Sequence, residues 1–192
     1  MFTALLDTCT LWPSLRRDFL LSLAIEGLYR PVWSSVILAE LEYEEAAKLV
    51  TRGSSPEEAE RRACHLVTQM RTAFNDALVE GWEGLEGSYG LPDPDDEHVV
   101  AAAVVANAGA IVTENVKDFP IDRLPSAIDV VPPDVFATNT VEISPGHALA
   151  AVRAIAVRSG RIGLRLTPSD VLGLLEIRYG MVDAVNLLRP LL

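Results

Sequence analysis

Cysteine and histidine are scarce in this chain of 192 residues, which contains two cysteines and three histidines. Cys9 and Cys64 are too few for a disulfide framework, and together with the histidines they show no paired spacing of zinc ligands. Zinc ribbons and small scaffolds held by disulfides are therefore excluded.

Long hydrophobic runs are also missing. The longest apolar segments, such as residues 99–106, are far shorter than the roughly 20 residues that a helix needs to cross a bilayer. The first residues, Met1 to Asp7, place no basic leader before an apolar run, as a secretory signal would. We therefore expect a cytoplasmic protein with no membrane association.

Basic residues are outnumbered, with 16 Lys and Arg against 27 Asp and Glu and a net charge of −11. Residues 1–138 carry −13, whereas residues 139–192 carry +2. Affinity for nucleic acid comes largely from Lys and Arg, which release counterions from phosphates. A polyanionic substrate would therefore need a bound cation or a basic partner.

Hydrophobic residues make up 49% of the chain, as in a folded globular protein. Short apolar runs, which predict buried strands, alternate with segments of helical spacing that begin at capping residues. The expected strands are residues 2–6, 31–33, 77–82 and 110–113, and the expected helices are residues 14–28, 35–49, 56–74 and 99–108. This order predicts an α/β fold with a parallel sheet and helices on both faces.

The polar and proline-rich residues between Pro132 and Thr140 predict a domain boundary. We place one domain at residues 1–137 and a small helical extension at residues 138–192. Helices are expected from Ser144-Pro145 and from Thr167-Pro168, with a third apolar segment at residues 181–188. The extension is too short to bury a large core, so it should pack on the sheet domain or on another subunit. Its arginines either bind nucleic-acid phosphates or complement the charge of the acidic domain, and we favour the second role. These arginines are Arg153, Arg158, Arg161 and Arg165.

Several carboxylates fall where ligands bind in open α/β sheets, beyond the carboxyl ends of the strands. Asp7 ends the first strand, Asp118 follows the strand that ends at Thr113, and Asp96 lies in the first turn of the preceding helix. Glu40, in the helix after the second strand, can point into the same crevice. Carboxylates about 5 Å apart repel by roughly 3 kcal/mol per pair at an effective dielectric constant near 20. Such a cluster predicts a hard divalent cation, Mg²⁺ or Mn²⁺, and phosphoryl-transfer chemistry.

Each acid also has a simpler explanation when it is taken alone. Asp95 and Asp96 could simply stabilise the positive N-terminal end of a helix, and Asp118 could simply accept a backbone hydrogen bond in a turn. Glu40 could belong to a solvated helix face. Asp93 is expected to cap a helix rather than bind a metal, and His98 to be a surface or packing residue. The order of the acids along the chain, rather than any one of them, predicts the metal site.

The ordered motifs resemble those of PIN-domain ribonucleases, most closely the VapC-like toxins of bacterial toxin–antitoxin pairs. The resemblance covers about residues 1–137 and rests on four segments: Leu5-Leu6-Asp7-Thr8, Ile37-Leu38-Ala39-Glu40, Pro92-Asp93-Pro94-Asp95-Asp96 with the following residues to Ala103, and Thr113-Glu114-Asn115-Val116-Lys117-Asp118-Phe119-Pro120. It implies a three-layer α/β/α fold that gathers acids around Mg²⁺ or Mn²⁺ and cleaves RNA. It also implies inhibition by a cognate antitoxin and a homodimer.

Carried over by position, the resemblance implies that Asp7, Glu40 and Asp96 are the three core acids and Asp118 the fourth. Thr113 matches a polar residue of the family, Asn115 stands where some members carry an Asp, and Asp95 is a supporting residue. Asp7, Asp96 and Asp118 would hold the metal, while Glu40 would contact it and orient or deprotonate the attacking water. Two alternatives remain: a binding or regulatory module that holds a cation without catalysis, and a nuclease that acts on DNA.

Overall fold

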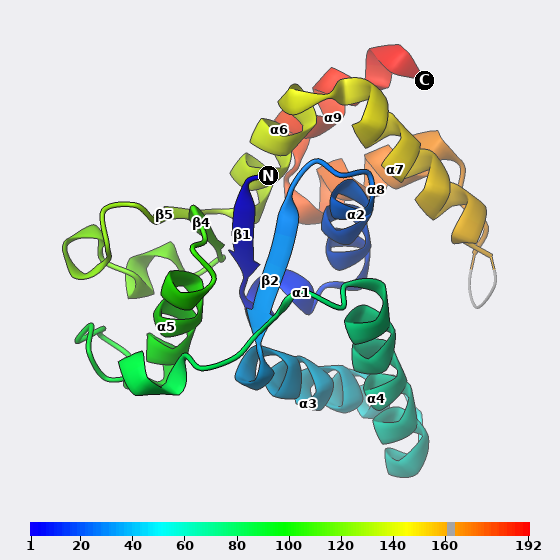
Figure 1. Ribbon diagram of the computed structural model, residues 1–192. Helices are drawn as coiled ribbons and strands as arrows, with labels where there is room; N and C mark the ends of the chain where they lie inside the picture. The colour runs from blue at the N-terminus through cyan, green and yellow to red at the C-terminus, as the bar shows by residue number, and fades with distance from the viewer. Residues whose placement is uncertain (161–163) are drawn as a thin grey trace.

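The computed structural model describes residues 1–160 and 164–192, so Arg161 lies outside the described residues. Five parallel strands form one sheet in the order β3-β2-β1-β4-β5 (Figure 1). Their bounds are β1 Thr3–Leu6, β2 Arg30–Ser34, β3 Leu78–Val79, β4 Ala110–Val112 and β5 Asp129–Val131. The predicted parallel α/β architecture is confirmed.

Helices connect the strands and cover both faces of the sheet. Helix α5 packs on β1, β2 and β4, and α2 packs against β2 from the other face (Figure 1). The α-helices are α1 Thr8–Leu11, α2 Ser14–Ile25, α3 Ser35–Thr51, α4 Pro56–Ala73, α5 Glu97–Val105, α6 Pro133–Ile143, α7 Pro145–Arg158, α8 Pro168–Tyr179 and α9 Val182–Leu188. Short 3-10 turns are η1 Glu83–Leu85, η2 Pro94–Asp96, η3 Val116–Asp118, η4 Ile121–Arg123 and η5 Arg189–Leu191.

Strand β1 lies at the centre of the sheet, between β2 and β4. Its Ala4, Leu5 and Leu6 are fully buried, as a run of apolar residues in a doubly covered parallel strand should be. The chain moves outward on one side from β1 to β2 and on the other side from β4 to β5. Leu6 pairs with Val112, so Asp7 and Thr113 leave neighbouring strands side by side. This is the position in an α/β sheet where ligands bind.

Capping residues begin several helices where the sequence predicts them. Ser34 accepts a hydrogen bond from the amide of Ile37 at the start of α3, and Ser55 accepts one from Glu58 at the start of α4. Thr167 and Asp170 form a reciprocal capping box at the start of α8. The structure corrects the expected strand at residues 77–82, which pairs only at Leu78–Val79 because the chain then leaves the edge of the sheet.

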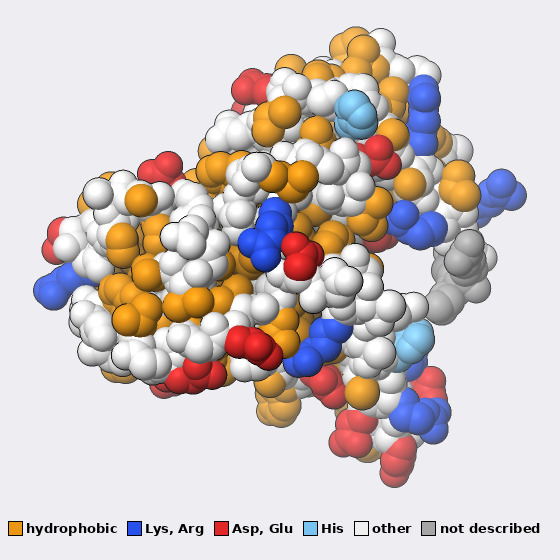
Figure 2. Space-filling view, in the orientation of Figure 1, with side chains coloured by type: hydrophobic (Ala, Val, Ile, Leu, Met, Phe, Trp, Pro, Cys, Tyr) orange, Lys and Arg blue, Asp and Glu red, His pale blue; other side chains and the backbone are white. Residues whose placement is uncertain are grey.

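The C-terminal helices pack on the sheet domain, and in the space-filling view their side chains adjoin those of the sheet domain across the middle of the molecule (Figure 2). Helix α7 lies along α2, and α6 packs on α9 (Figure 1). As a result α2 is buried on more than one side, with Phe19, Leu20 and Leu23 all in the core. Arg158 of α7 pairs with Asp18 of α2 at 3.0 Å, so this arginine does balance an acid of the sheet domain. The position after residue 137, where we placed the boundary, lies within α6.

None of the helices in the described ranges is long and apolar enough to cross a membrane.

Candidate active site

Asp7 is a nearly buried carboxylate, 7% exposed, held by three donors at the end of β1. It is the N-cap of α1, and its Oδ1 accepts the amide hydrogen of Thr8 at 2.6 Å. Its Oδ2 accepts hydrogen bonds from the Thr113 hydroxyl at 2.7 Å and from the Cys9 thiol at 3.0 Å. The carboxylate is therefore fixed in position by groups from α1, which follows β1, and from the loop that follows β4.

Cys9 supports Asp7 as a hydrogen-bond donor. Burial, followed by the charge of Asp7, raises the pKa of the Cys9 thiol to about 11. The thiol is therefore protonated at neutral pH, whereas a nucleophilic cysteine needs a lowered pKa. Cys9 positions the acid and is not itself a nucleophile.

Glu40 lies on α3 and is held from two directions. The Thr8 hydroxyl donates to Glu40 Oε2, and His98 Nε2 lies 3.6 Å from Glu40 Oε1. Burial alone would raise the pKa of Glu40, but the contacts with His98 and Thr8 outweigh it, so the pKa of Glu40 is lowered. Glu40 is therefore a carboxylate at neutral pH.

His98 is a contact that the sequence reasoning missed. It is buried, as a packing residue should be, but it also links Glu40 to Ser34, whose hydroxyl lies 3.4 Å from His98 Nδ1. Its ring also packs against Trp82, with centroids 5.9 Å apart. The sequence signal is a histidine close to the acidic segment, but its spacing of two residues from Asp96 predicts that it points to another side of a regular helix.

Asp96 ends the turn η2 and is the N-cap of α5. Partial burial, together with the negative charges of Asp7, Asp93 and Asp118, raises the pKa of Asp96 to about 6, and His98 opposes this shift. Because the negative charges of Asp7 and Asp118 both raise the pKa of Asp96, the three carboxylates contribute to one region of negative potential. Their mutual repulsion favours a positive charge between them.

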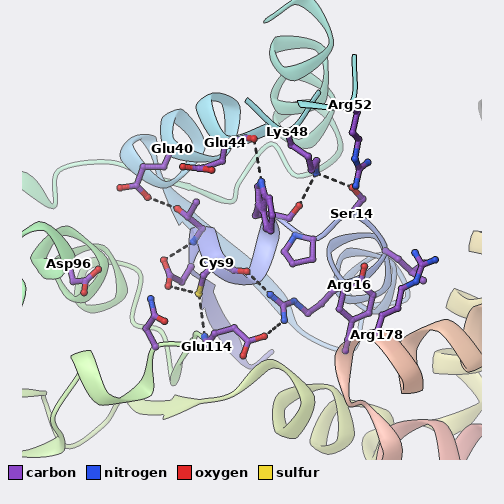
Figure 3. Close-up of a pocket in the computed structure, with 17 residues that line it drawn as sticks. Cys9, Ser14, Arg16, Glu40, Glu44, Lys48, Arg52, Asp96, Glu114 and Arg178 are labelled. Atoms are coloured by element: carbon purple, nitrogen blue, oxygen red, sulfur yellow. Dashed lines mark hydrogen bonds and ion pairs between the residues drawn. The ribbon is translucent and has the colours of Figure 1, made fainter. Parts of the chain in front are cut away.

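One cavity of about 1010 Å³ brings several of the candidate residues together. Asp7, Glu40, Asp96 and Asn115 line it, and they come from four separate elements (Figure 3). Asp118 acts on Asp96 but is not among the residues that line this cavity. Asp95 is exposed and also does not line it.

Thr113 and Asp93 have defined local roles. The Thr113 hydroxyl donates to Asp7 and accepts the amide hydrogen of Asn115 at 3.1 Å, so it fixes the start of the loop after β4. Asp93 Oδ1 accepts the amide hydrogen of Asp95 at 3.0 Å and is the N-cap of η2. The prediction of Asp93 as a cap is confirmed.

The donor set has the chemistry of a site for a hard cation. Asp7, Glu40 and Asp96 offer oxygen atoms, which Mg²⁺ and Mn²⁺ prefer, and Asp96 experiences uncompensated repulsion from its neighbours. In the described part of the chain, however, no three or more His, Cys, Asp or Glu side chains are already gathered tightly enough to hold a metal ion. A cation would therefore have to draw these carboxylates inward. Asp96 is half-buried and its carboxylate, unlike that of Asp7, accepts no hydrogen bond from the residues that the structure describes.

Glu97, next to Asp96, is a buried carboxylate that anchors the preceding loop. Its Oε2 accepts the amide hydrogen of Tyr89 and its Oε1 that of Leu91, both at 3.0 Å. Burial tends to raise the pKa of Glu97, but these amides, with those of Gly90 and Gly87, lower it overall. Because Glu97 and Asp96 are adjacent, the anchor of the loop also fixes the start of α5.

We expect Glu97→Gln to lower the stability of the protein, because its amide group places a donor against a backbone donor. Leaving a buried amide unpaired costs about 1–3 kcal/mol, which corresponds to about 2–12 °C in the unfolding midpoint of a chain of this size. Glu86→Gln, an exposed residue of the same loop, is the matched control and should leave the midpoint unchanged. Equal midpoints for the two variants would contradict the anchoring role.

The lowered pKa of Glu97 also fixes the sign of its pH dependence. Its contribution to stability is complete above the ordinary pKa of 4.5 and is lost as the pH falls below that value. Thermal unfolding of the parent and of Glu97→Gln should therefore differ most at neutral pH and converge in acid.

Comparison with known proteins gives a family match. A family model described as "PIN domain" matches residues 3–117, which is more than half of the chain and contains Asp7, Glu40 and Asp96. Comparisons with curated proteins and with solved structures give no match.

Proposed function

Because this chain belongs to the PIN-domain family, whose members are typically metal-dependent nucleases, we propose that it hydrolyses phosphodiester bonds of RNA. The observation that carries the proposal is the cavity into which β1, α3 and η2 bring Asp7, Glu40 and Asp96. Three acids from separate elements, in one open cavity at the carboxyl edge of a parallel sheet, are suited to a cation and a phosphate.

Asp7 and Asp96 would hold Mg²⁺ or Mn²⁺, and Asp118, whose negative charge acts on Asp96, would contribute. Such an ion, when bound, lowers the pKa of water and offsets the charge that develops on the phosphate. Glu40 stays ionised and accepts a hydrogen bond from the attacking water, and its lowered pKa suits it to orienting that water more than to storing its proton. Thr113 and Asn115 keep the loop after β4 in place. No covalent bond to the protein is required.

The direct test incubates purified protein with RNA or with DNA of the same sequence, with and without Mn²⁺, and sequences the new ends. We expect discrete new ends in RNA and only in the presence of the ion. Cleavage of DNA but not of RNA would show that the proposed RNA substrate is wrong and that DNA is the substrate.

We expect Mn²⁺ affinity to fall as the pH drops below about 6, because a proton then occupies Asp96. For competition with one proton the fall is about tenfold per pH unit, with little change above about pH 7. Calorimetric titration of Mn²⁺ at about pH 5 and pH 8 measures the effect. Equal affinities at the two pH values would contradict the role of Asp96, and Asp96→Asn should bind more weakly but with a flatter pH dependence.

A second candidate function is a PIN-like binding module without catalytic activity. It is favoured by the net charge of −11, which disfavours binding of a nucleic acid, and by the additional helical extension. Asn115, where some relatives carry an acid, agrees with it. Mn²⁺ binding without cleavage of RNA or DNA would select this function.

We further propose that the protein is the toxin of a toxin–antitoxin pair and forms a homodimer. The support is the resemblance of its motifs to VapC-like toxins. An adjacent reading frame that encodes a small protein with a basic segment, and loss of cleavage when that protein is added, would test the antitoxin. Light scattering of the purified protein would test the dimer.

A further inference from the structure

The C-terminal extension reaches the candidate active site. Arg178 and Tyr179, at the end of α8, line the same cavity as Asp7 and Asp96. The guanidinium carbon of Arg16 lies over the ring of Tyr179, 5.7 Å from the centroid of that ring. Arg16 is itself buried and donates to the carbonyls of Cys9 and Thr10, beside Asp7. The end of α8 is therefore fixed against the part of the chain that carries the acid.

Charges of opposite sign lie at opposite ends of this cavity. Figure 3 shows Asp96 and Glu40 toward one side and Arg52 and Arg178 toward the other. Arg16 and Lys48, which also line the cavity, are already paired with Glu114 and Glu45. Among the described residues, neither Arg52 nor Arg178 forms an ion pair within 4 Å, and both are exposed. These two guanidinium groups are available to a ligand.

An aromatic side chain lies along the same cavity. Trp12 is 38% exposed and lines the cavity, with its indole nitrogen donating to the carbonyl of Glu44 at 3.3 Å. The ammonium group of Lys48 lies 5.3 Å from the centre of its ring. Both contacts hold the ring in a fixed orientation. Exposed aromatic rings beside cationic groups are the usual surfaces on which unpaired bases stack.

We propose that Arg52 and Arg178 bind backbone phosphates on one side of the scissile bond of a single-stranded RNA, and that Trp12 stacks one of its bases. The proposal rests on the proposed function, because the acids at the other end of the cavity would hold the phosphate that is cleaved. The cavity is at the upper end of the range for small-molecule sites, about 300–1,000 Å³, and so has room for more than one nucleotide. Single strands fit better than duplexes, because a base must leave its stack to contact Trp12.

The test measures RNA binding separately from cleavage. In protein that also carries Asp7→Asn, the affinity for a short fluorescent single-stranded RNA is measured by anisotropy between about 50 and 200 mM NaCl. Arg178→Ala and Arg52→Ala should each weaken binding about five- to tenfold and reduce the slope of log K against log salt by about 0.7. Trp12→Ala should weaken binding by at least about fivefold and leave the slope unchanged.

The matched control is Arg153→Ala. Arg153 lies on α7 of the same extension, is exposed and does not line the cavity, so the change in net charge is identical. We expect this variant to bind RNA like its parent. Unfolding midpoints of all the variants confirm that the fold is retained.

Two results separate this inference from the proposed function. If the unmodified protein cleaves RNA while Arg178→Ala and Arg52→Ala bind like Arg153→Ala, the phosphate contacts are wrong and the nuclease stands. If the unmodified protein cleaves nothing while these variants lose RNA binding, the phosphate contacts in the cavity are supported and the nuclease activity is rejected. Equal binding of duplex and single-stranded RNA would overturn the role of Trp12.

Discussion

Asp7→Asn is expected to reduce RNA cleavage by about a thousandfold, equivalent to about 4 kcal/mol of activation free energy. Asp7 is the most firmly held of the candidate acids, with donors from Thr8, Cys9 and Thr113 around it. Asparagine has nearly the same shape but no negative charge, so it binds a divalent cation far more weakly. Initial rates of cleavage at saturating Mn²⁺ measure the loss.

The same substitution should leave the fold intact. Asparagine caps helices about as well as aspartate, so its Oδ1 can still accept the amide hydrogen of Thr8 at the start of α1. The Thr113 hydroxyl, which donates to Asp7 in the parent, can rotate and accept from the new amide. We therefore expect the free energy of unfolding to change by about 1 kcal/mol or less, which keeps the unfolding midpoint within a few degrees of the parent.

Asp122→Asn is the control for this change. Asp122 lies in the exposed turn η4 and, among the residues that the structure describes, pairs with its neighbour Arg123 alone, at 3.7 Å; its substitution removes the same charge. It should cleave at the parent rate. Cleavage by Asp7→Asn at that rate would remove Asp7 from the active site, and loss of activity in both variants would show that net charge alone was responsible.

The second large effect concerns the cation itself. We expect excess chelator to abolish cleavage and added Mn²⁺ or Mg²⁺ to restore it, because the repulsion that raises the pKa of Asp96 is then offset. A ligand at 100 times its dissociation constant stabilises a protein by about 2.7 kcal/mol, which is about 5–10 °C for a chain of this size. Thermal unfolding with and without Mn²⁺ therefore reports binding without reference to activity.

Asp7→Asn again provides the control, since its unfolding midpoint should respond little to Mn²⁺. A parent protein that cleaves RNA in chelator, with no shift of its midpoint in Mn²⁺, would exclude cation-dependent hydrolysis at this cavity. A shift of the midpoint without any cleavage would instead favour the binding module.

The sequence predicted the central part of the fold well because local signals were strong there. Apolar runs mark β1, β2 and β4, and Ser55 and Thr167 begin their helices as expected. It missed β5 and α6, which meet at Pro132-Pro133. Two prolines look like a linker, yet Pro133 begins a helix, where its lack of an amide hydrogen costs nothing.

The residues around the acids were harder to predict, because their positions depend on packing between distant elements. Asp96 was assigned to a regular helix with His98, but it belongs to a 3-10 turn and helical spacing does not apply to it. The contact between His98 on α5 and Glu40 on α3 depends on how these two distant elements pack, which the sequence does not show. Arg178 and Arg52 gave no signal along the chain, since only the packing of α8 on α2 brings Arg178 to the cavity that Arg52, at the C-terminus of α3, also lines.

Helix α2 gives the extension a structural consequence that does not depend on RNA. Its apolar side chains contact the sheet on one side and α7 on the other. A shortened chain without α7 would expose one of these surfaces to water as a hydrophobic patch, which favours self-association. Reducing this protein to its family-matching region would therefore produce an aggregating fragment and not a smaller working unit.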